Sequence, residues 1–237
     1  MKKQTNYKPL LKEMQIRRGE VYTFLCMPAM GKTKLAMDLT TYFSYDEKLN
    51  GIFLSNDTTE RIADAVNHFN NIKFIDHQGR LNYQFDDIYD YNKINKLITH
   101  NNADFLVVDT VYRLHGEGNE SKFITHLKEI AERNNIFIIC TAPLERLFDM
   151  KVAPKELLKN AKEEAIARRL IHQSDFVAFI NRWSYNNVTL DNNYNLSADF
   201  IITKSNHRNT TVNIKDFATF MLPVGKFSSN SNEWNVS

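Results

Sequence analysis

The residues best suited to chemistry lie in the stretch CMPAMGKT, from Cys26 to Thr33. It ends like the phosphate-binding pattern G-x-x-x-x-G-K-[ST], although Cys26 stands where that pattern opens with glycine. In such a loop, backbone N–H groups and a helix N-terminus surround the phosphates, the lysine contacts them and the hydroxyl binds Mg²⁺. We expect Gly31, Lys32 and Thr33 to perform these tasks.

The surroundings of this stretch favour a nucleotide site over an ordinary strand–turn–helix corner with a surface lysine. Residues 19–27 form a strand-like apolar run, and residues 31–47 carry apolar side chains at roughly helical spacing. Cys26 falls at the strand exit, where a small side chain is tolerated, and Gly31 is kept where backbone approaches phosphate. The residues expected to contact the nucleotide are Pro28, Ala29, Met30, Gly31, Lys32, Thr33 and Lys34.

A second candidate is Asp109, which ends the buried run FLVVD. Open α/β sheets place ligand groups at the carboxyl ends of their strands. Asp109 is therefore predicted to hold Mg²⁺, directly or through water, opposite Thr33. The alternative is a strand-end aspartate that caps the following turn, but the phosphate-loop pattern upstream favours the metal.

The elements that must position these residues alternate along the chain. Because each strand is a nearly continuous apolar run, the pattern predicts a mostly parallel sheet covered on both faces, in one α/β domain. The C-terminal strands are expected at the sheet edge. The expected strands are 19–27, 50–57, 71–76, 103–114, 136–144, 174–183, 197–205 and 210–217, and the expected helices are 31–47, 58–70, 87–102, 119–135 and 153–170.

Composition excludes several classes of protein. The formal net charge is +2, so a histone-like positive coat is absent and any nucleic-acid contact must be local. The two cysteines, Cys26 and Cys140, suggest neither a disulfide framework nor a Cys-rich metal site. No apolar run approaches the length needed to span a membrane. These features predict a cytoplasmic protein.

Five stretches together resemble the RecA-like ATPase domain of hexameric replicative DNA helicases of the DnaB type, and the stand-alone RepA-type helicases of plasmids. They cover nearly the whole chain, in the family's order: RRGEVYTFLCMPAMGKTKLAMDL, GIFLSNDTTERIADAV, DFLVVDTVYRLHGEGNES, IFIICTAPLER and HQSDFVAFINRW with SADFIITKSNHRNTTVNI. The resemblance implies a RecA-like P-loop NTPase fold with antiparallel C-terminal edge strands. It also implies ATP and Mg²⁺ as cofactors.

The resemblance assigns further catalytic residues besides Lys32. The family's catalytic glutamate would fall at Asn56, and RepA-like members carry an acidic pair here. The expected catalytic acid is therefore Asp57, or Glu60 one turn later. Lys204 matches the lysine, and Arg208 the arginine finger, that reach the ATP of a neighbouring subunit.

The strand that in the family ends in a γ-phosphate-sensing Gln or His has Pro143 at the nearest position, with Thr141 as a possible substitute. In the family, the loops after this strand and after the Asp109 strand line a DNA channel. The second loop carries Arg146, Lys151, Lys155, Lys159 and Lys162 here, interspersed with Glu156, Glu163 and Glu164. A DNA contact and an ordinary solvated helix face both fit that pattern.

Two functions follow. The first is an ATP-driven ring motor, expected to be a hexamer, that acts on single-stranded DNA in replication. The second is an ATP-binding oligomeric accessory protein for recombination or helicase loading, with little turnover and with other replication or recombination proteins as partners. Asn56 and Pro143 favour the second, and the extent of the resemblance favours the first. A small-molecule kinase is disfavoured because the chain has no Arg-rich lid segment.

The expected domain organisation is an N-terminal extension (1–18), a RecA-like ATPase domain (19–226) and a polar C-terminal tail (227–237).

Overall fold

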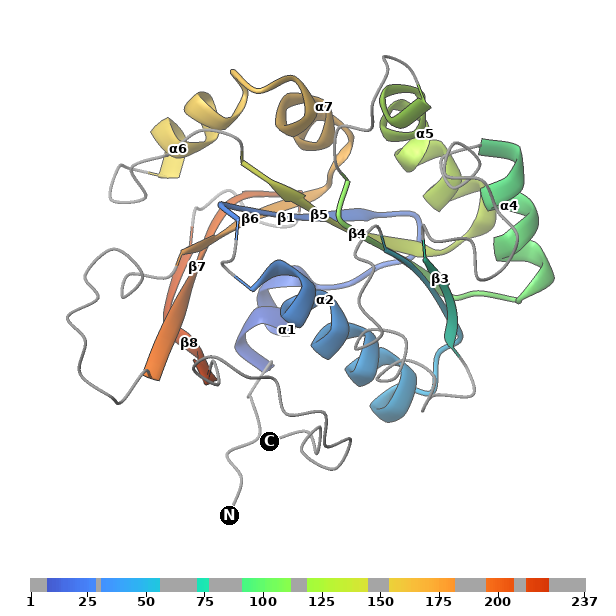
Figure 1. The fold of residues 1–237 in the computed structure, drawn as a ribbon, viewed down its shortest axis with the longest axis horizontal. Coiled ribbons are helices and arrows are strands. Elements are labelled where there is room, and N and C mark those ends of the chain that lie inside the picture. The colour runs from blue at the N-terminus through green and yellow to red at the C-terminus, as the bar shows by residue number, and fades with distance from the viewer. Residues whose placement is uncertain are drawn as a thin grey trace.

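One sheet of eight strands organises the described part of the chain, in the order β3-β2-β4-β5-β1-β6-β7-β8. The computed structural model describes residues 8–28, 31–55, 72–76, 91–111, 119–144, 154–181, 195–206 and 212–221. Figure 1 shows the sheet running across the molecule. The strands are β1 (Val21–Cys26), β2 (Gly51–Ser55), β3 (Ile72–Asp76), β4 (Phe105–Asp109), β5 (Phe137–Pro143), β6 (Phe176–Asn181), β7 (Asn195–Ser205) and β8 (Val212–Met221).

The six strands from β3 to β6 pair in parallel. Strand β7 then pairs antiparallel with β6, and β8 antiparallel with β7. This arrangement confirms the predicted fold class, a mostly parallel sheet with antiparallel C-terminal edge strands. It also brings the carboxyl ends of β1, β4 and β5 to one edge of the sheet.

Helices cover both faces of the sheet, as predicted (Figure 1). Helices α1 (Lys8–Met14) and α2 (Lys32–Thr41) lie on one face, and a short π-helix, η1 (Tyr42–Asp46), continues α2. Helices α4 (Tyr91–His100), α5 (Asn119–Asn134), α6 (Pro154–Ala161) and α7 (Ala165–Gln173) lie on the other. Every residue of β1, β2 and β4 is buried, which explains why these strands read as unbroken apolar runs.

The single helix predicted over 153–170 is wrong, because the chain forms two helices there. Helix α6 ends at Ala161, and α7 begins after Glu164, whose backbone is extended (φ −84°, ψ 130°). The break lets the two helices pack on different neighbours, since α6 contacts β7 while α7 contacts α5 and β1. No proline or glycine marks this turn, so nothing in the local sequence indicates it.

Residues that precede the first predicted strand contribute to the core. Helix α1 was not predicted, yet Leu10 and Met14 are fully buried. The predicted helix 58–70 lies outside the described residues. Within the predicted stretch 103–114, strand β4 covers Phe105–Asp109 and ends at Asp109, as predicted, so the chain leaves the sheet at the candidate metal ligand.

Candidate functional site

The phosphate-loop candidate leaves the sheet from the end of β1. Cys26 is the last residue of that strand, its side chain is fully buried, and its carbonyl accepts a hydrogen bond from Leu144 N at 2.8 Å. Cys26, which occupies the position of the motif's first glycine, therefore belongs to the strand and not to the loop. Pro28, two residues on, is exposed.

Gly31 makes the turn from this loop into α2. Its φ of 95° and ψ of 22° lie in the left-handed region, which favours glycine because it lacks a Cβ. It also occupies the N-cap of α2, where it has no side chain to cap the first-turn N–H groups. Those N–H groups, together with the positive end of the helix dipole, form the kind of arrangement that binds phosphate.

The three residues after Gly31 point in different directions. The Lys32 ammonium turns back over the loop and donates to the Met27 carbonyl at 3.4 Å. Thr33 is half-buried beside the sheet edge. The Lys34 side chain is exposed and forms an ion pair with Asp38 one turn later, so only its backbone remains suited to a phosphate.

Asp109 lies at the same edge of the sheet, at the end of β4. It is fully buried, and its Oδ1 accepts hydrogen bonds from Thr141 Oγ1 at 2.6 Å and Thr110 Oγ1 at 3.3 Å. Its Oδ2, also buried, has no hydrogen-bond partner among the described residues. Because buried polar atoms are nearly always paired, this oxygen is a candidate position for binding a ligand.

The surroundings of Asp109 act on its charge in opposite directions. Burial raises the pKa of the carboxyl above its ordinary value of 3.8. The Thr141 hydroxyl, then the Thr33 hydroxyl and the Lys32 ammonium, oppose that rise in pKa by favouring the charged form. The Lys32 ammonium and the Thr33 hydroxyl therefore both lie near the Asp109 carboxylate.

The residues at this edge fit Mg²⁺ better than a metal held entirely by protein. Within the described ranges, no group of three or more His, Cys, Asp or Glu side chains gathers to hold a metal ion. Magnesium is usually held by one or two protein oxygens together with water and substrate phosphates. A buried carboxylate oxygen without a partner, facing a threonine hydroxyl at a helix N-terminus, matches that donor set.

Several predicted site residues lie outside the described residues, so the structure does not place them. They are Ala29, Met30, Asp57, Glu60 and Arg208, together with Asn56. Ser55, which precedes Asn56, pairs with Asp109 in the sheet register. The candidate catalytic acids thus follow a strand that adjoins the strand carrying Asp109.

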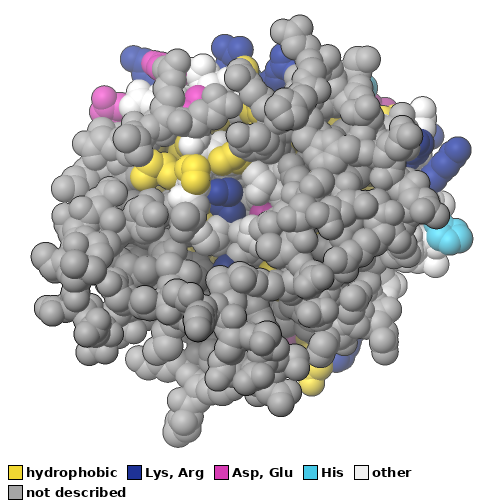
Figure 2. Space-filling model, viewed as in Figure 1, with side chains coloured by type: hydrophobic (Ala, Val, Ile, Leu, Met, Phe, Trp, Pro, Cys, Tyr) yellow, Lys and Arg dark blue, Asp and Glu magenta, His cyan; other side chains and the backbone are white. Residues whose placement is uncertain are grey.

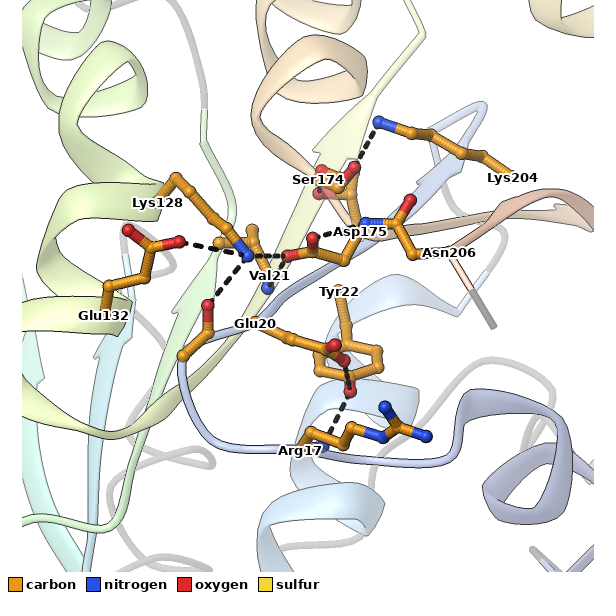
Figure 3. A network of polar contacts seen from close by, with 12 residues as sticks. Arg17, Glu20, Val21, Tyr22, Lys128, Glu132, Ser174, Asp175, Lys204 and Asn206 are labelled. Carbon is orange, nitrogen blue, oxygen red and sulfur yellow. Dashed lines mark hydrogen bonds and ion pairs between the residues drawn. The ribbon is translucent and has the colours of Figure 1, made fainter. Parts of the chain in front are cut away.

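Lys204 lies far from this edge. It pairs with Val177 at the beginning of β6, which is the opposite end of the parallel strands. Figure 3 shows its ammonium directed to the end of α7, where it donates to the Ser174 carbonyl and, at 3.0 Å, to the Ile171 carbonyl. Burial lowers the pKa of Lys204, and the Asp175 carboxylate opposes that effect.

A polar network that sequence reasoning missed surrounds this end of the sheet (Figure 3). Asp175 Oδ2 accepts from Lys128 Nζ at 2.7 Å and from Val21 N at 2.9 Å. Its Oδ1 accepts from Asn206 Nδ2 at 2.6 Å, and its carbonyl accepts from Asn206 N at 2.9 Å. These residues come from four distant parts of the chain, so no spacing in the sequence could have revealed them.

The candidate DNA-contacting segment is described only from residue 154 on. Lys159 and Lys162 are exposed there, and so are Glu156 and Glu163, whereas Glu164 is buried. Figure 2 shows basic side chains with acidic ones among them along the edge of the molecule over α6 and α7. Helix α7 carries two further exposed basic residues, Arg168 and Arg169. Among the helices described, none is long and apolar enough to cross a bilayer.

Comparison with known proteins supports the fold. No family model and no curated protein sequence matches this chain. A KaiC-like protein of Pyrococcus horikoshii OT3 superimposes with a TM-score of 0.57 at 15% identity, over 83% of this chain and 84% of that one. A DnaB-like replicative helicase, solved in a study of its interactions with primase, has a TM-score of 0.61 at 15% identity and covers 88% of this chain.

A third solved structure, that of an ATPase domain, superimposes with a TM-score of 0.59 at 13% identity, over 92% of this chain and 90% of that domain. The present chain spans 59% of the DnaB-like helicase chain. Because the identities are this low, the superpositions establish the fold alone, and it is the RecA-like fold that the resemblance implied.

Proposed function

We propose that this protein binds ATP with Mg²⁺ at the carboxyl edge of its sheet and hydrolyses it as an oligomeric motor on single-stranded DNA, in the manner of DnaB- and RepA-type helicases. The observation that carries the proposal is the buried Oδ2 of Asp109, which lacks a hydrogen-bond partner in the part of the chain that the structure describes and lies near Lys32 and Thr33 at the N-terminus of α2. The RecA-like fold of the chain supports it.

Each residue of this edge has a role that follows from its chemistry. The first-turn N–H groups after Gly31 would surround the β-phosphate, and Lys32 would exchange its contact with the Met27 carbonyl for phosphate oxygens. Thr33 and Asp109 would hold Mg²⁺, whose contribution when bound is to neutralise charge on the phosphate oxygens. Asp57 or Glu60 would orient and deprotonate the attacking water.

The position of Lys204 supports an oligomer. Lys204 and Asp109 lie at opposite ends of the sheet, so Lys204 cannot reach the ATP site of its own chain. A neighbouring copy could present Lys204, and Arg208 four residues on, to that site. A finger supplied in this way contributes about 10³-fold or more to phosphoryl transfer. We therefore propose a ring, expected to be a hexamer, with ATP between subunits.

The basic face over α6 and α7 supports a DNA contact. Between residues 156 and 173, which cover most of these two helices and the turn that joins them, four exposed Lys or Arg side chains outnumber two exposed Glu side chains. They are Lys159, Lys162, Arg168 and Arg169 against Glu156 and Glu163. A ring would repeat these residues once per subunit. Phosphate contacts from several subunits would give an affinity that falls steeply with salt.

Pro143 favours the second candidate function, an accessory protein that binds ATP but turns it over slowly. Pro143 ends β5 and has no side-chain donor or acceptor. The Thr141 hydroxyl, the possible substitute sensor, is hydrogen-bonded to Asp109 instead. Neither residue is thus free to sense the γ-phosphate.

Steady-state ATPase measurements with and without single-stranded DNA separate the two functions. The motor predicts DNA-stimulated turnover that Lys32→Ala abolishes and that Lys96→Ala, a change at an exposed lysine of α4, leaves intact. Loss of the phosphate contacts of Lys32 is expected to weaken ATP binding about 10- to 100-fold, because each charged hydrogen bond contributes about 1.5–3 kcal/mol. Negligible turnover with tight ATP binding would contradict the motor and leave the accessory function.

The mass of the particle tests the oligomer independently. We expect a single-chain mass to give way to a ring mass when ATP and Mg²⁺ are added, as measured by mass photometry. A particle that stays monomeric with ATP bound would rule out Lys204 and Arg208 as residues acting on a neighbour.

A further inference from the structure

Thr141 occupies a particular place in the site. It lies on β5, between the strand that ends in Asp109 and the strand that leads into the phosphate loop. Its side chain is fully buried. Its backbone carbonyl also accepts a hydrogen bond from Val111 N at 2.8 Å, which ties the chain just after Asp109 to the same residue.

The hydrogen bonds that the described residues donate to the Asp109 carboxylate all go to Oδ1. Thr141 Oγ1 lies 2.6 Å from Oδ1, and Thr110 Oγ1 lies 3.3 Å both from Oδ1 and from Thr141 Oγ1. Since a carboxylate can only accept, the Thr141 proton points to Oδ1, and the Thr141 oxygen remains able to accept from Thr110. Both hydroxyls therefore engage the same carboxylate oxygen, and Oδ2 is left without a partner among the described residues.

We propose that Thr141 is a positioning residue that fixes the rotation of the Asp109 carboxylate, so that Oδ2 and not Oδ1 faces the magnesium of the bound nucleotide. This inference rests on the proposed function. A carboxylate held by one short hydrogen bond to a rigid central strand cannot rotate freely. Thr110, on the longer contact, contributes in the same direction but less.

If Thr141 fixes the Asp109 carboxylate, position 141 needs a side chain that carries a hydroxyl donor and fits the buried space. Thr141→Val keeps the shape of the side chain but removes the donor, which leaves Oδ1 buried with only the longer Thr110 contact. Thr141→Ser keeps the donor. Groups that orient a metal-ligating carboxylate typically change metal affinity by about 10- to 100-fold when they are removed.

A matched control exists in the neighbouring strand. Thr23 on β1 is also a fully buried threonine, and its hydroxyl lies 2.6 Å from the Ser174 hydroxyl, away from Asp109. Ser174 Oγ donates to the Leu170 carbonyl, so Thr23→Val orphans no donor. The Thr23→Val variant therefore measures the general effect of removing a buried threonine hydroxyl from the sheet, without changing the hydrogen bonds of the Asp109 carboxylate.

The test is the Mg²⁺ dependence of nucleotide binding, measured by the fluorescence of N-methylanthraniloyl-ATP over a Mg²⁺ titration and in EDTA. We expect Thr141→Val to raise the Mg²⁺ concentration for half-maximal binding about tenfold, with binding in EDTA unchanged. Thr141→Ser and Thr23→Val should follow the wild-type titration. A Thr141→Val titration identical to wild type, or an equal loss of binding in EDTA, would overturn the inference.

Two further measurements let the experiment test the inference even if Thr141→Val does not fold. Should Thr141→Val fail to fold, Thr141→Cys, which keeps only a weak donor, must still raise the Mg²⁺ requirement above that of Thr141→Ser, or the inference fails. Wild-type protein that binds nucleotide equally with and without Mg²⁺ would overturn the proposed function itself. The wild-type arm thus tests the metal site, and the comparison of variants tests Thr141.

Discussion

Asp109 and Asp175 are both buried aspartates at ends of the same sheet, yet their surroundings differ. Asp175 lies where β6 begins, and both of its carboxylate oxygens have donors, from Lys128, Val21 and Asn206. Asp109 lies where β4 ends, and one of its oxygens has no hydrogen-bond partner among the described residues. Among the described residues, the first carboxylate has donors for both of its oxygens and the second has donors for only one.

This difference in hydrogen bonding distinguishes a carboxylate that stabilises the fold from one that is suited to bind a ligand. A buried carboxylate whose hydrogen bonds are all made holds distant parts of the chain together, and breaking it leaves other groups unpaired. A buried carboxylate with a missing partner costs stability until a ligand supplies that partner. We therefore assign Asp175 to the architecture and Asp109 to the site.

The largest effect on stability is expected at the amino edge. Asp175→Ala leaves the buried Val21 N–H without its acceptor and takes the nearer carboxylate from the Lys128 ammonium, which keeps the Gly19 carbonyl. It should lower the free energy of unfolding by about 2–4 kcal/mol. Urea unfolding followed by circular dichroism measures this. A loss below about 1 kcal/mol would mean that the Asp175 network is not what holds these strands together.

A smaller change of opposite sign is expected at the carboxyl edge. Without nucleotide and Mg²⁺, Asp109→Asn should leave the free energy of unfolding unchanged or raise it by up to about 2 kcal/mol, because it removes a buried charge that lacks a partner. The same urea titration measures it. Destabilisation as large as that of Asp175→Ala would contradict the contrast between the two aspartates.

The pH dependence of that change follows from the raised pKa of Asp109. When a carboxyl has a higher pKa in the folded state than in the unfolded state, its contribution to stability is present at low pH and is lost as pH rises through the folded pKa. The wild type should therefore lose stability relative to Asp109→Asn as pH rises above the ordinary value of 3.8. A difference between the two proteins that is constant from about pH 4 to about pH 7 would contradict the assignment.

A loss of stability smaller than that of Asp175→Ala is expected at Gly31. Gly31→Ala places a Cβ on a backbone with φ of 95° and should cost about 1 kcal/mol of folding stability. It should weaken ATP binding more than this cost suggests, because the loop would have to distort where it meets the phosphates. Thermal unfolding with and without ATP measures both. An unchanged ATP-induced shift would show that the turn is not part of the site.

The sequence alone predicted those parts of the molecule whose structure depends on neighbouring residues in the chain. Continuous apolar runs predicted the parallel strands, because a strand buried on both faces has no polar side. Gly-Lys-Thr after such a run predicted the turn at Gly31, and the aspartate that ends FLVVD predicted a carboxylate at the same edge.

What the sequence could not supply depends on contacts between distant residues. The Thr141 hydroxyl was a candidate sensor of phosphate, and only the packing of β5 against β4 shows that it is bound to Asp109. In the Asp175 network, a single hydrogen bond joins two residues that are 154 positions apart, Val21 and Asp175. The break between α6 and α7 has no local breaker and follows from the different neighbours of the two helices.

The most direct test of the central claim is calorimetric titration of wild type and Asp109→Asn with ATP, each with Mg²⁺ and with EDTA. We predict that Mg²⁺ tightens ATP binding to the wild type by at least about tenfold, and that Asp109→Asn loses this enhancement while its binding in EDTA is retained. Equal enhancement by Mg²⁺ in both proteins, or no ATP binding by the wild type, would contradict the claim that this edge of the sheet is a Mg²⁺–nucleotide site.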